Sequence, residues 1–331
     1  MTAHQPSTAN TREITSAAEV LVRVQGYLDT FVVGQQRLRE SLLIGLLTEG
    51  HLLLESVPGL AKTTAASALA GAVSSSFARI QCTPDLLPSD IIGTQIYNAS
   101  TGAFDTRLGP VHAHIILLDE INRSSAKTQS AMLEAMQERQ TTIGGKRFDL
   151  PNPFLVMATQ NPIEQEGTYP LPEAQLDRFM LKDVLAYPTP DEELDILRRL
   201  DDGVFETHPD PACSVEELRG MQQSASNIYI DPAISRYIVE LVWATRAADR
   251  VIGPRGAFVE AGASPRASIA FTRASRALAL IRGRNYVIPE DVKDLAQRIL
   301  GHRIALTFEG IAEGVTTTQL VTEILNRVRT P

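Results

Sequence analysis

One short segment constrains the fold of this 331-residue chain more than any other, because it joins an apolar strand to a helix through a tight loop. The strand is predicted at residues 52–55. The loop and the first helical turn consist of Ser56, Val57, Pro58, Gly59, Leu60, Ala61, Lys62, Thr63 and Thr64. In this arrangement backbone N–H groups and the positive end of the helix dipole converge on the β- and γ-phosphates of a nucleotide. The sequence therefore predicts a phosphate-binding loop, with Lys62 as a point charge and Thr63 as a ligand of Mg²⁺.

The match to the phosphate-binding pattern is imperfect, because Ser56 and Ala61 stand where that pattern has glycine. An ordinary strand-turn-helix with a lysine in its first turn is the alternative interpretation. The methyl group of Ala61 is tolerated beside a phosphate if its φ is negative, whereas a positive φ would be strained by about 1 kcal/mol or more. We expect this departure to affect the rate of catalysis and not the fold.

A second motif favours the nucleotide-binding interpretation. Residues 114–118 form an apolar run that ends in Asp119 and Glu120, the pattern of a parallel strand buried on both faces. The carboxyl end of such a strand places its acids beside a bound nucleotide. We expect Asp119 to hold Mg²⁺ through water and Glu120 to polarise the attacking water.

Composition and pattern predict two domains. With 331 residues and 44% hydrophobic content the chain can bury two cores. Residues 1–15 are polar and are expected to form a mobile tail, residues 16–188 an α/β core with a parallel sheet, and residues 189–331 a helical lid. No apolar run reaches the ~18 to 20 residues of a membrane span, and the start lacks the apolar segment of a signal peptide. A cytoplasmic protein without membrane insertion is the expectation.

Charge and cysteine content exclude some classes of partner and site. The net charge is −8 and the pI is near 5.4, which removes the electrostatic attraction that dominates non-specific nucleic-acid binding. The charge therefore disfavours nucleic acid as a partner and leaves open a basic pore within an acidic subunit. Cys82 and Cys213 lie far apart without metal-ligand spacing, and are expected to be inert buried thiols.

Two hairpins and a further strand are predicted within the α/β core. Residues 95–98 and 103–107 flank a turn, and Gly144 and Gly145 supply the positive φ angles of a second, two-residue turn. Residues 154–159 form another buried strand, which ends in Gln160-Asn161-Pro162 and so brings an amide beside the two acids.

The ordered set of motifs resembles the MoxR family of AAA+ ATPases over nearly the whole chain. The motifs are Val33-Gly34-Gln35, Glu55 through Thr63, Leu118 through Arg123, Ala158 through Pro162, Leu171 through Phe179, and Ser264 through Ala267. The resemblance implies that Gly34 and Gln35 border the adenine and that Asn161 is the sensor-1 residue that orients the lytic water. It also implies that Arg178 is an arginine finger and Arg266 the sensor-2 arginine. The two hairpins would be the helix-2 insert and the pre-sensor-1 hairpin.

Both arginines have other interpretations. Arg178 could form an ion pair within the chain with Asp177 or Glu173. Arg266 follows Ser264-Pro265, a helix-start signal, and an arginine at a helix N-terminus is electrostatically disfavoured. It therefore needs a partner, for which a phosphate and the carboxylate of Glu260 are both suitable.

The resemblance also implies how the protein works. It implies an ATPase that needs Mg²⁺ and assembles as a homo-oligomeric ring, most often a hexamer. It implies a chaperone for protein clients, with a von Willebrand factor A-domain protein as partner. A DNA motor or a chelatase-type subunit shares this ATP site, and a nucleotide-gated scaffold with little turnover is the third class. The acidic charge disfavours the DNA motor, and a pure nucleotide binder would need none of Glu120, Asn161 and Arg178.

Overall fold

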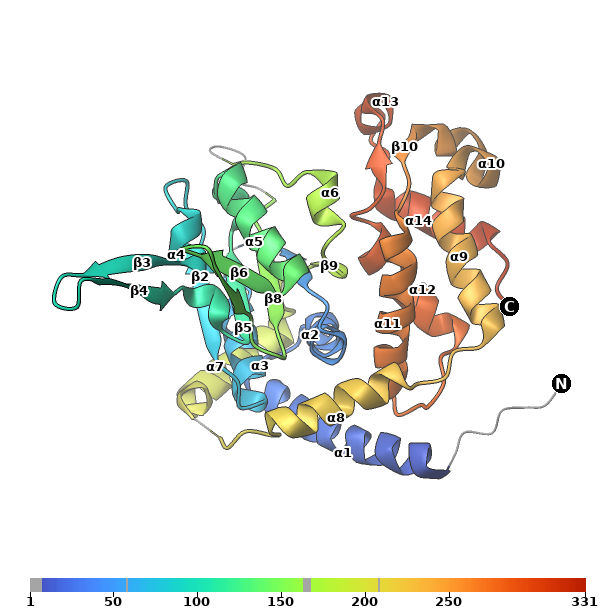
Figure 1. Cartoon of the computed structure of the whole chain (residues 1–331). Helices are drawn as coiled ribbons and strands as arrows, with labels where there is room; N and C mark the ends of the chain where they lie inside the picture. The colour runs from blue at the N-terminus through green and yellow to red at the C-terminus, as the bar shows by residue number, and fades with distance from the viewer. Residues whose placement is uncertain (1–7, 58, 163–167, 208) are drawn as a thin grey trace.

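The computed structural model describes residues 8–57, 59–162, 168–207 and 209–331, and Figure 1 shows the arrangement of its elements. A five-stranded parallel sheet lies at the centre of the core in the order β2-β5-β8-β1-β9. Its strands are β1 (Leu52–Glu55), β2 (Phe77–Gln81), β5 (Ile115–Asp119), β8 (Leu155–Gln160) and β9 (Leu181–Val184). Because all neighbours pair in parallel, the carboxyl ends of all five strands lie at one edge. The predicted α/β core with a parallel sheet is confirmed.

Helices cover both faces of the sheet because its strands are apolar on both sides. In β1, Leu52 and Leu54 pack with the helices of one face, and Leu53 packs with those of the other. The first face carries α1 (Thr8–Phe31), α2 (Gln36–Thr48) and α3 (Lys62–Ala72), and the second carries α4 (Pro88–Ile92) and α5 (Ala126–Glu138). Short 3-10 and α-helical turns connect these layers: η1 (Pro110–His112), η2 (Ile121–Arg123) and α6 (Glu173–Leu176).

Both predicted hairpins are present. The first is formed by β3 (Gly93–Asn98) and β4 (Ala103–Leu108), and it extends away from the core in Figure 1. The second is formed by β6 (Gln140–Ile143) and β7 (Lys146–Asp149). Gly144 and Gly145 have φ angles of 57° and 77°, as the two-residue turn requires.

The N-terminal tail is shorter than predicted. Helix α1 begins at Thr8, so the expectation of a mobile tail is wrong for residues 8–15, while residues 1–7 lie outside the described residues. The physical reason is an apolar stripe that starts early in the chain. Ile14, Ala17, Leu21 and Val24 recur every three or four residues and are buried in the main core.

The C-terminal part is helical, with one small exception. Its elements are α7 (Pro190–Asp201), η3 (Val204–Glu206), α8 (Val215–Ser226), α9 (Pro232–Arg246), α10 (Ala248–Ile252), η4 (Gly253–Phe258), β10 (Val259–Ala261), α11 (Pro265–Ile281), α12 (Pro289–Leu300), β11 (Ala305–Leu306), α13 (Phe308–Ala312) and α14 (Thr317–Arg327). Strands β10 and β11 form an antiparallel ribbon that the sequence did not indicate. Within the part of the chain that the structure describes, no helix has the length and apolar composition of a membrane span.

Helices α7 and α8 follow the predicted lid boundary at residue 189 but pack on helices of the core. Arg199 of α7 donates to the carbonyl of Thr30 in α1 at 2.9 Å. Gln222 of α8 donates to the carbonyl of Leu46 in α2 at 2.8 Å. The bundle from α9 onward lies beside the core (Figure 1).

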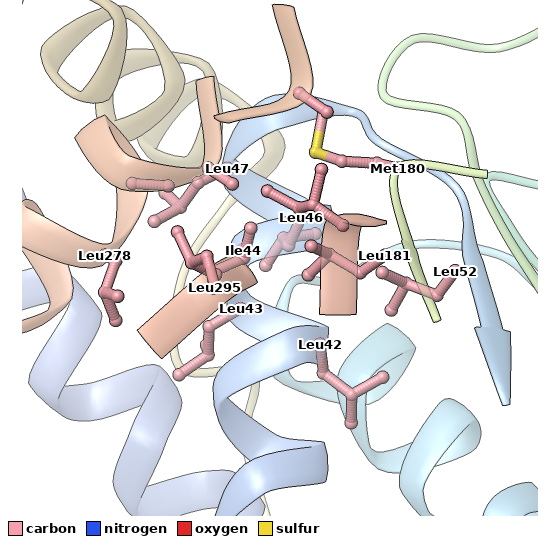
Figure 2. Close-up of a cluster of buried hydrophobic side chains, with 14 of the residues drawn as sticks. Leu42, Leu43, Ile44, Leu46, Leu47, Leu52, Met180, Leu181, Leu278 and Leu295 are labelled. Atoms are coloured by element: carbon pink, nitrogen blue, oxygen red, sulfur yellow. The ribbon is translucent and has the colours of Figure 1, made fainter. Parts of the chain in front are cut away.

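Helix α2 joins the two parts because it is buried from both sides. Figure 2 shows leucines of α2 between β1 and β9 on one side and the lid helices α11 and α12 on the other. Leu42, Leu46 and Ile44 are each at most 1% exposed, and Leu278 and Leu295 of the lid are fully buried against the same cluster. Core and lid therefore share one continuous apolar core.

Both cysteines are free and buried. Burial raises the pKa of the Cys82 thiol to about 12 and that of Cys213 to about 11. Thiolate chemistry is thus suppressed at both positions, as an inert role requires.

Candidate active site

The phosphate-binding loop lies between β1 and α3 at the carboxyl edge of the sheet. Ser56 begins the loop, and its N–H donates to the carbonyl of Gln160 at 3.0 Å, which ties the loop to the end of β8. Pro58 lies outside the described residues. A cavity of about 350 Å³ opens above the loop and is lined by Gly59, Leu60, Ala61, Lys62, Thr63, Thr64, Arg79, Gln81, Asp119 and Glu120.

The loop turns into α3 through two residues with positive φ. Gly59 has φ 87°, and Ala61, the residue before the helix, has φ 50° and ψ 21°. A left-handed alanine costs roughly 1–2 kcal/mol, so the strained case anticipated for Ala61 is the one that the structure contains. This conformation turns the chain into the first helical turn, where free N–H groups and the helix dipole favour an anion.

Lys62 points back into the loop. Its Nζ lies 3.4 Å from the carbonyl oxygen of Val57, which it can reach as a donor. Burial lowers the pKa of Lys62, and the carboxylates of Asp119 and Glu120 oppose that shift. The Lys62 side chain thus lies over the loop and lines the same cavity as the two acids, which is a suitable position for contact with phosphate oxygens.

Asp119 and Glu120 are fixed by several hydrogen bonds. Thr159 Oγ1 donates to Asp119 Oδ1 at 2.8 Å and accepts from the backbone N–H of Glu120 at 2.8 Å. Arg79 forms an ion pair with Asp119 Oδ2 at 2.6 Å. Glu120 has φ 58°, a strained conformation for this residue, and its Oε2 accepts from Gln81 at 3.1 Å. Strain of this kind persists where neighbouring contacts determine the backbone.

Arg79, Gln81 and Thr159 were not identified from the sequence. Each lies on a strand that pairs with β5, and the registers Gln81↔Asp119 and Leu118↔Ala158 place these polar side chains beside the acids. The only sequence signal was polar residues at the ends of predicted strands. Once the strand order is known, that signal identifies which polar residues lie beside Asp119 and Glu120.

The residues at this cavity fit Mg²⁺ and a nucleotide triphosphate. Asp119 and Thr63 offer a carboxylate and a hydroxyl oxygen, the hard donors that Mg²⁺ prefers. Among the described residues no group of three His, Cys, Asp or Glu could hold a metal ion by itself. One carboxylate and one hydroxyl, from Asp119 and Thr63, are a suitable donor set for Mg²⁺, because this ion usually keeps waters and binds through one or two carboxylates together with phosphates of the substrate.

Three other predicted site residues lie at the same edge of the sheet. Asn161 directly follows β8, next to the carbonyl of Gln160 that holds the loop. Gly34 and Gln35 have φ angles of 61° and 47°, and Gln35 Nε2 donates to the carbonyl of Ala186 at 2.7 Å. Because Ala186 follows the carboxyl end of β9, both residues flank the P-loop edge, where an adenine would lie.

Arg178 and Arg266 lie at the opposite edge. Arg178 precedes β9, which pairs in parallel with β1 in the register Leu52↔Leu181, whereas the P-loop follows β1. The length of β1, roughly 10 Å, therefore separates Arg178 from the P-loop of its own chain. Both arginines line a cavity of about 300 Å³ between core and lid.

Asp177 holds the two arginine-bearing segments together. It forms an ion pair with Arg303 at 2.9 Å, accepts from Ser264 Oγ at 2.8 Å and lies 3.7 Å from Arg266. The carboxylate partner of Arg266 is thus Asp177 and not Glu260. Among the described residues no carboxylate pairs with Arg178, and its Nε is buried without a hydrogen-bond partner.

Comparison with known proteins agrees with this geometry. The family described as "ATPase family associated with various cellular activities (AAA)" matches residues 51–181, and the AAA lid domain matches residues 256–324. Chaperone MoxR1 of Mycobacterium tuberculosis is 46% identical over 330 residues, which cover 99% of this chain and 87% of that protein. Protein MoxR of Paracoccus denitrificans is 31% identical, covering 85% of this chain and 87% of the relative. A solved structure of a Cytophaga hutchinsonii protein has a TM-score of 0.91 at 45% identity and covers 97% of both chains.

Proposed function

Because the chain belongs to the MoxR family of AAA+ ATPases, we propose that it hydrolyses ATP in the P-loop cavity in a reaction that depends on Mg²⁺. One observation carries this proposal. Lys62, Thr63, Asp119 and Glu120 come from separate motifs, and all line one cavity at the carboxyl edge of the sheet. Together these residues supply a cation, two metal-binding oxygens and a general base, which are the groups that phosphoryl transfer needs.

Each residue has a distinct proposed role. Lys62 and the N–H groups at the start of α3 bind the β- and γ-phosphates, and Thr63 and Asp119 hold the metal ion. Bound Mg²⁺ neutralises phosphate charge during transfer. Glu120 orients the attacking water and accepts its proton, and Asn161 holds the same water from the end of β8. Glu120 Oε2 is contacted by Gln81 and by Arg123, each at 3.1 Å, and these contacts compete with the water for the carboxylate, which favours a slow basal rate.

We place Arg178 and Arg266 in the active site of a neighbouring subunit. They lie at the edge of the sheet opposite to their own P-loop, so a head-to-tail contact is needed to bring them to a γ-phosphate. A repeated head-to-tail contact closes into a ring when the rotation allows it, and a hexamer is the size that we propose. Catalysis would then require assembly, since each chain contributes half of two sites.

The client is proposed to be a protein, and the partner a von Willebrand factor A-domain protein. The family membership supports a chaperone role, and the β3–β4 hairpin offers a contact surface. Tyr97 and Phe104 on this hairpin are 58% and 64% exposed, with ring centroids 5.3 Å apart. Exposed paired aromatic rings are typical of protein contact sites. A cytoplasmic location belongs to the same proposal, and cell fractionation tests it.

The decisive experiment compares two variants in binding and turnover. Lys62→Ala should lose ATP binding, whereas Glu120→Gln should bind ATP in the presence of Mg²⁺ and hydrolyse it at least about 100-fold more slowly than wild type. Glu134→Gln, an exposed acid on α5, is the matched control and should hydrolyse normally. Turnover by Glu120→Gln equal to wild type would contradict the assignment of the general base.

The same Glu120→Gln variant identifies the client. A ring stalled with ATP should retain what it normally releases, so proteins captured with ATP and absent without it are candidate clients. Recovery of a protein with a metal-binding A domain supports the proposal. Retention of DNA, together with stimulation of the wild-type ATPase by DNA, would favour the DNA motor instead.

A further inference from the structure

One side of α11 presents a stripe of arginines to the space between core and lid. Arg266, Ile269, Arg273 and Arg276 follow each other at intervals of three or four residues, so they lie along one side of the helix over roughly 15 Å. They line two adjoining cavities of about 300 and about 520 Å³. We call these four residues the α11 stripe. It extends from Arg266 along the cleft that these two cavities form.

The cleft has more positive charge than its own acids neutralise. Within the part of the chain that the structure describes, no carboxylate forms an ion pair with Arg178, Arg273 or Arg276. The Nε atoms of Arg178 and Arg276 are also buried without a hydrogen-bond partner. The two acids that line the cleft, Glu49 and Asp177, are already paired with other arginines. Arg178 and Arg276 are half-buried and Arg273 is exposed, so the cleft offers cationic groups that have no acid of their own to an anionic ligand.

A matching surface lies on α7. Leu194, Leu197 and Leu200 are 52%, 57% and 59% exposed and follow one another at intervals of three residues. Glu193 lies one turn before Leu197 and Asp201 one turn after it, so both acids share the leucine side of the helix. We call these five residues the α7 face. It combines apolar and acidic groups over roughly 12 Å, close to the length of the α11 stripe.

The charge of the chain is concentrated around this helix. Residues 190–210 contain eight acidic and two basic residues, a net charge of −6 within a chain whose total is −8. Some of these acids have local partners, as in the pair between Asp195 and Arg199. The acids of the α7 face form no ion pair among the residues that the structure describes. The segment therefore complements the arginine cleft in charge.

The two surfaces cannot meet within one chain. Helix α7 follows the carboxyl end of β9, whereas the cleft lies at the amino end of the same strand. Figure 1 places α2 between α7 and α11. A head-to-tail contact that brings a P-loop to Arg178 of the next subunit also turns the P-loop edge, with α7, toward the cleft of that subunit. A second copy of the chain is thus the partner that fits both charge and position.

We propose that the α7 face of one subunit docks on the α11 stripe of its neighbour, and that this contact fixes how neighbouring subunits align in the ring. The proposal rests on the ring described above and names the residues that build it. Acids of α7 would pair with Arg273 and Arg276, while the leucines cover Ile269 and the stems of the arginines. Pairing at these positions leaves Arg178 and Arg266 free for the γ-phosphate.

A charge-swap experiment tests the contact. Arg273→Glu/Arg276→Glu and Glu193→Arg/Asp201→Arg should each raise the protein concentration at half-assembly by about tenfold or more, measured by sedimentation velocity with ATP. A chain that carries all four substitutions restores opposite charges and should recover most of the assembly. Failure of the fourfold variant to assemble better than either double variant overturns the proposal.

Asp191→Arg/Asp202→Arg is the matched control. It makes the same change of charge in the first turn of α7 and at the residue that caps its carboxyl end, but on the side of Asp195 and Arg198, away from the leucines. Assembly of this control should stay close to wild type, and an equal loss would show a general charge effect and overturn the docking. Failure of this docking proposal can be told from failure of the proposed catalytic role of Arg178. The docking variants change assembly, whereas Arg178→Ala should assemble normally and only hydrolyse ATP poorly. Polyphosphate binding that Arg273→Glu/Arg276→Glu abolishes while assembly persists would assign the stripe to a free polyanion instead.

Discussion

Thr159→Val removes one buried hydroxyl that fixes both acids of the active site. The side chain is fully buried, donates to Asp119 Oδ1 at 2.8 Å and accepts from the N–H of Glu120 at 2.8 Å. A hydrogen bond to a charged group contributes about 1.5–3 kcal/mol, and a buried N–H left without a partner costs about 1–3 kcal/mol. Since valine keeps the volume, we expect a loss of about 2.5–6 kcal/mol in the free energy of unfolding, measured by urea denaturation, and a large fall in ATP hydrolysis.

Thr245→Val separates stability from catalysis. Thr245 is also fully buried, donates to the carbonyl of Val242 at 2.7 Å and accepts from the N–H of Ala263 at 2.9 Å. It lies in the lid and contacts no carboxylate through these bonds, so its loss should lower stability by about 1–3 kcal/mol while the assembled protein keeps its ATPase rate. The reasoning is refuted if Thr159→Val unfolds like wild type, or if both variants lose hydrolysis equally at matched folded fractions.

Three further changes have defined outcomes. Ala61→Gly relieves a left-handed residue, so urea denaturation should show stability unchanged or raised by up to about 1 kcal/mol, and a clear destabilisation would contradict the strain. Arg178→Ala should bind ATP but hydrolyse it poorly, and added Glu120→Gln subunits with an intact Arg178 should restore turnover; a co-assembled but inactive mixture would contradict the placement of Arg178 in the neighbouring site. Burial lowers the pKa of His51 to about 3 in the folded protein, whereas the pKa in the unfolded chain is near 6.5. Between these two pH values only the unfolded chain binds a proton at His51. The free energy of unfolding therefore falls by about 1.4 kcal/mol for each pH unit below about 6.5, until pH 3. His51→Gln should flatten this slope in unfolding measured from pH 7 to 4, and an unchanged slope would exclude His51 as its source.

The sequence predicted those site residues that lie at the end of a strand or in the loop that follows it. Lys62 lies one short loop after β1 and Asp119 ends β5, so a local motif is sufficient for both. Arg79 and Thr159 could not be found in this way, because their contacts with Asp119 depend on the pairing of strands that are far apart in the sequence. The early start of α1 is not apparent from the polar residues 1–13, because the apolar stripe that fixes this helix begins only at Ile14.

The position of Arg178 shows why a motif alone does not define an active site. Its role depends on which edge of the sheet its segment reaches, and β9 places that segment at the end of the sheet away from the P-loop. Arg303 then fixes the segment to the lid: it pairs with Asp177 at 2.9 Å and donates to the carbonyl of Phe179 at 2.6 Å. Asp177 also lies 3.7 Å from Arg266, so Arg266 and Arg303 share one carboxylate, and Arg178 directly follows that carboxylate in the chain. Asp177 therefore joins the segments that carry Arg178 and Arg266, at the surface where a neighbouring subunit would present its nucleotide.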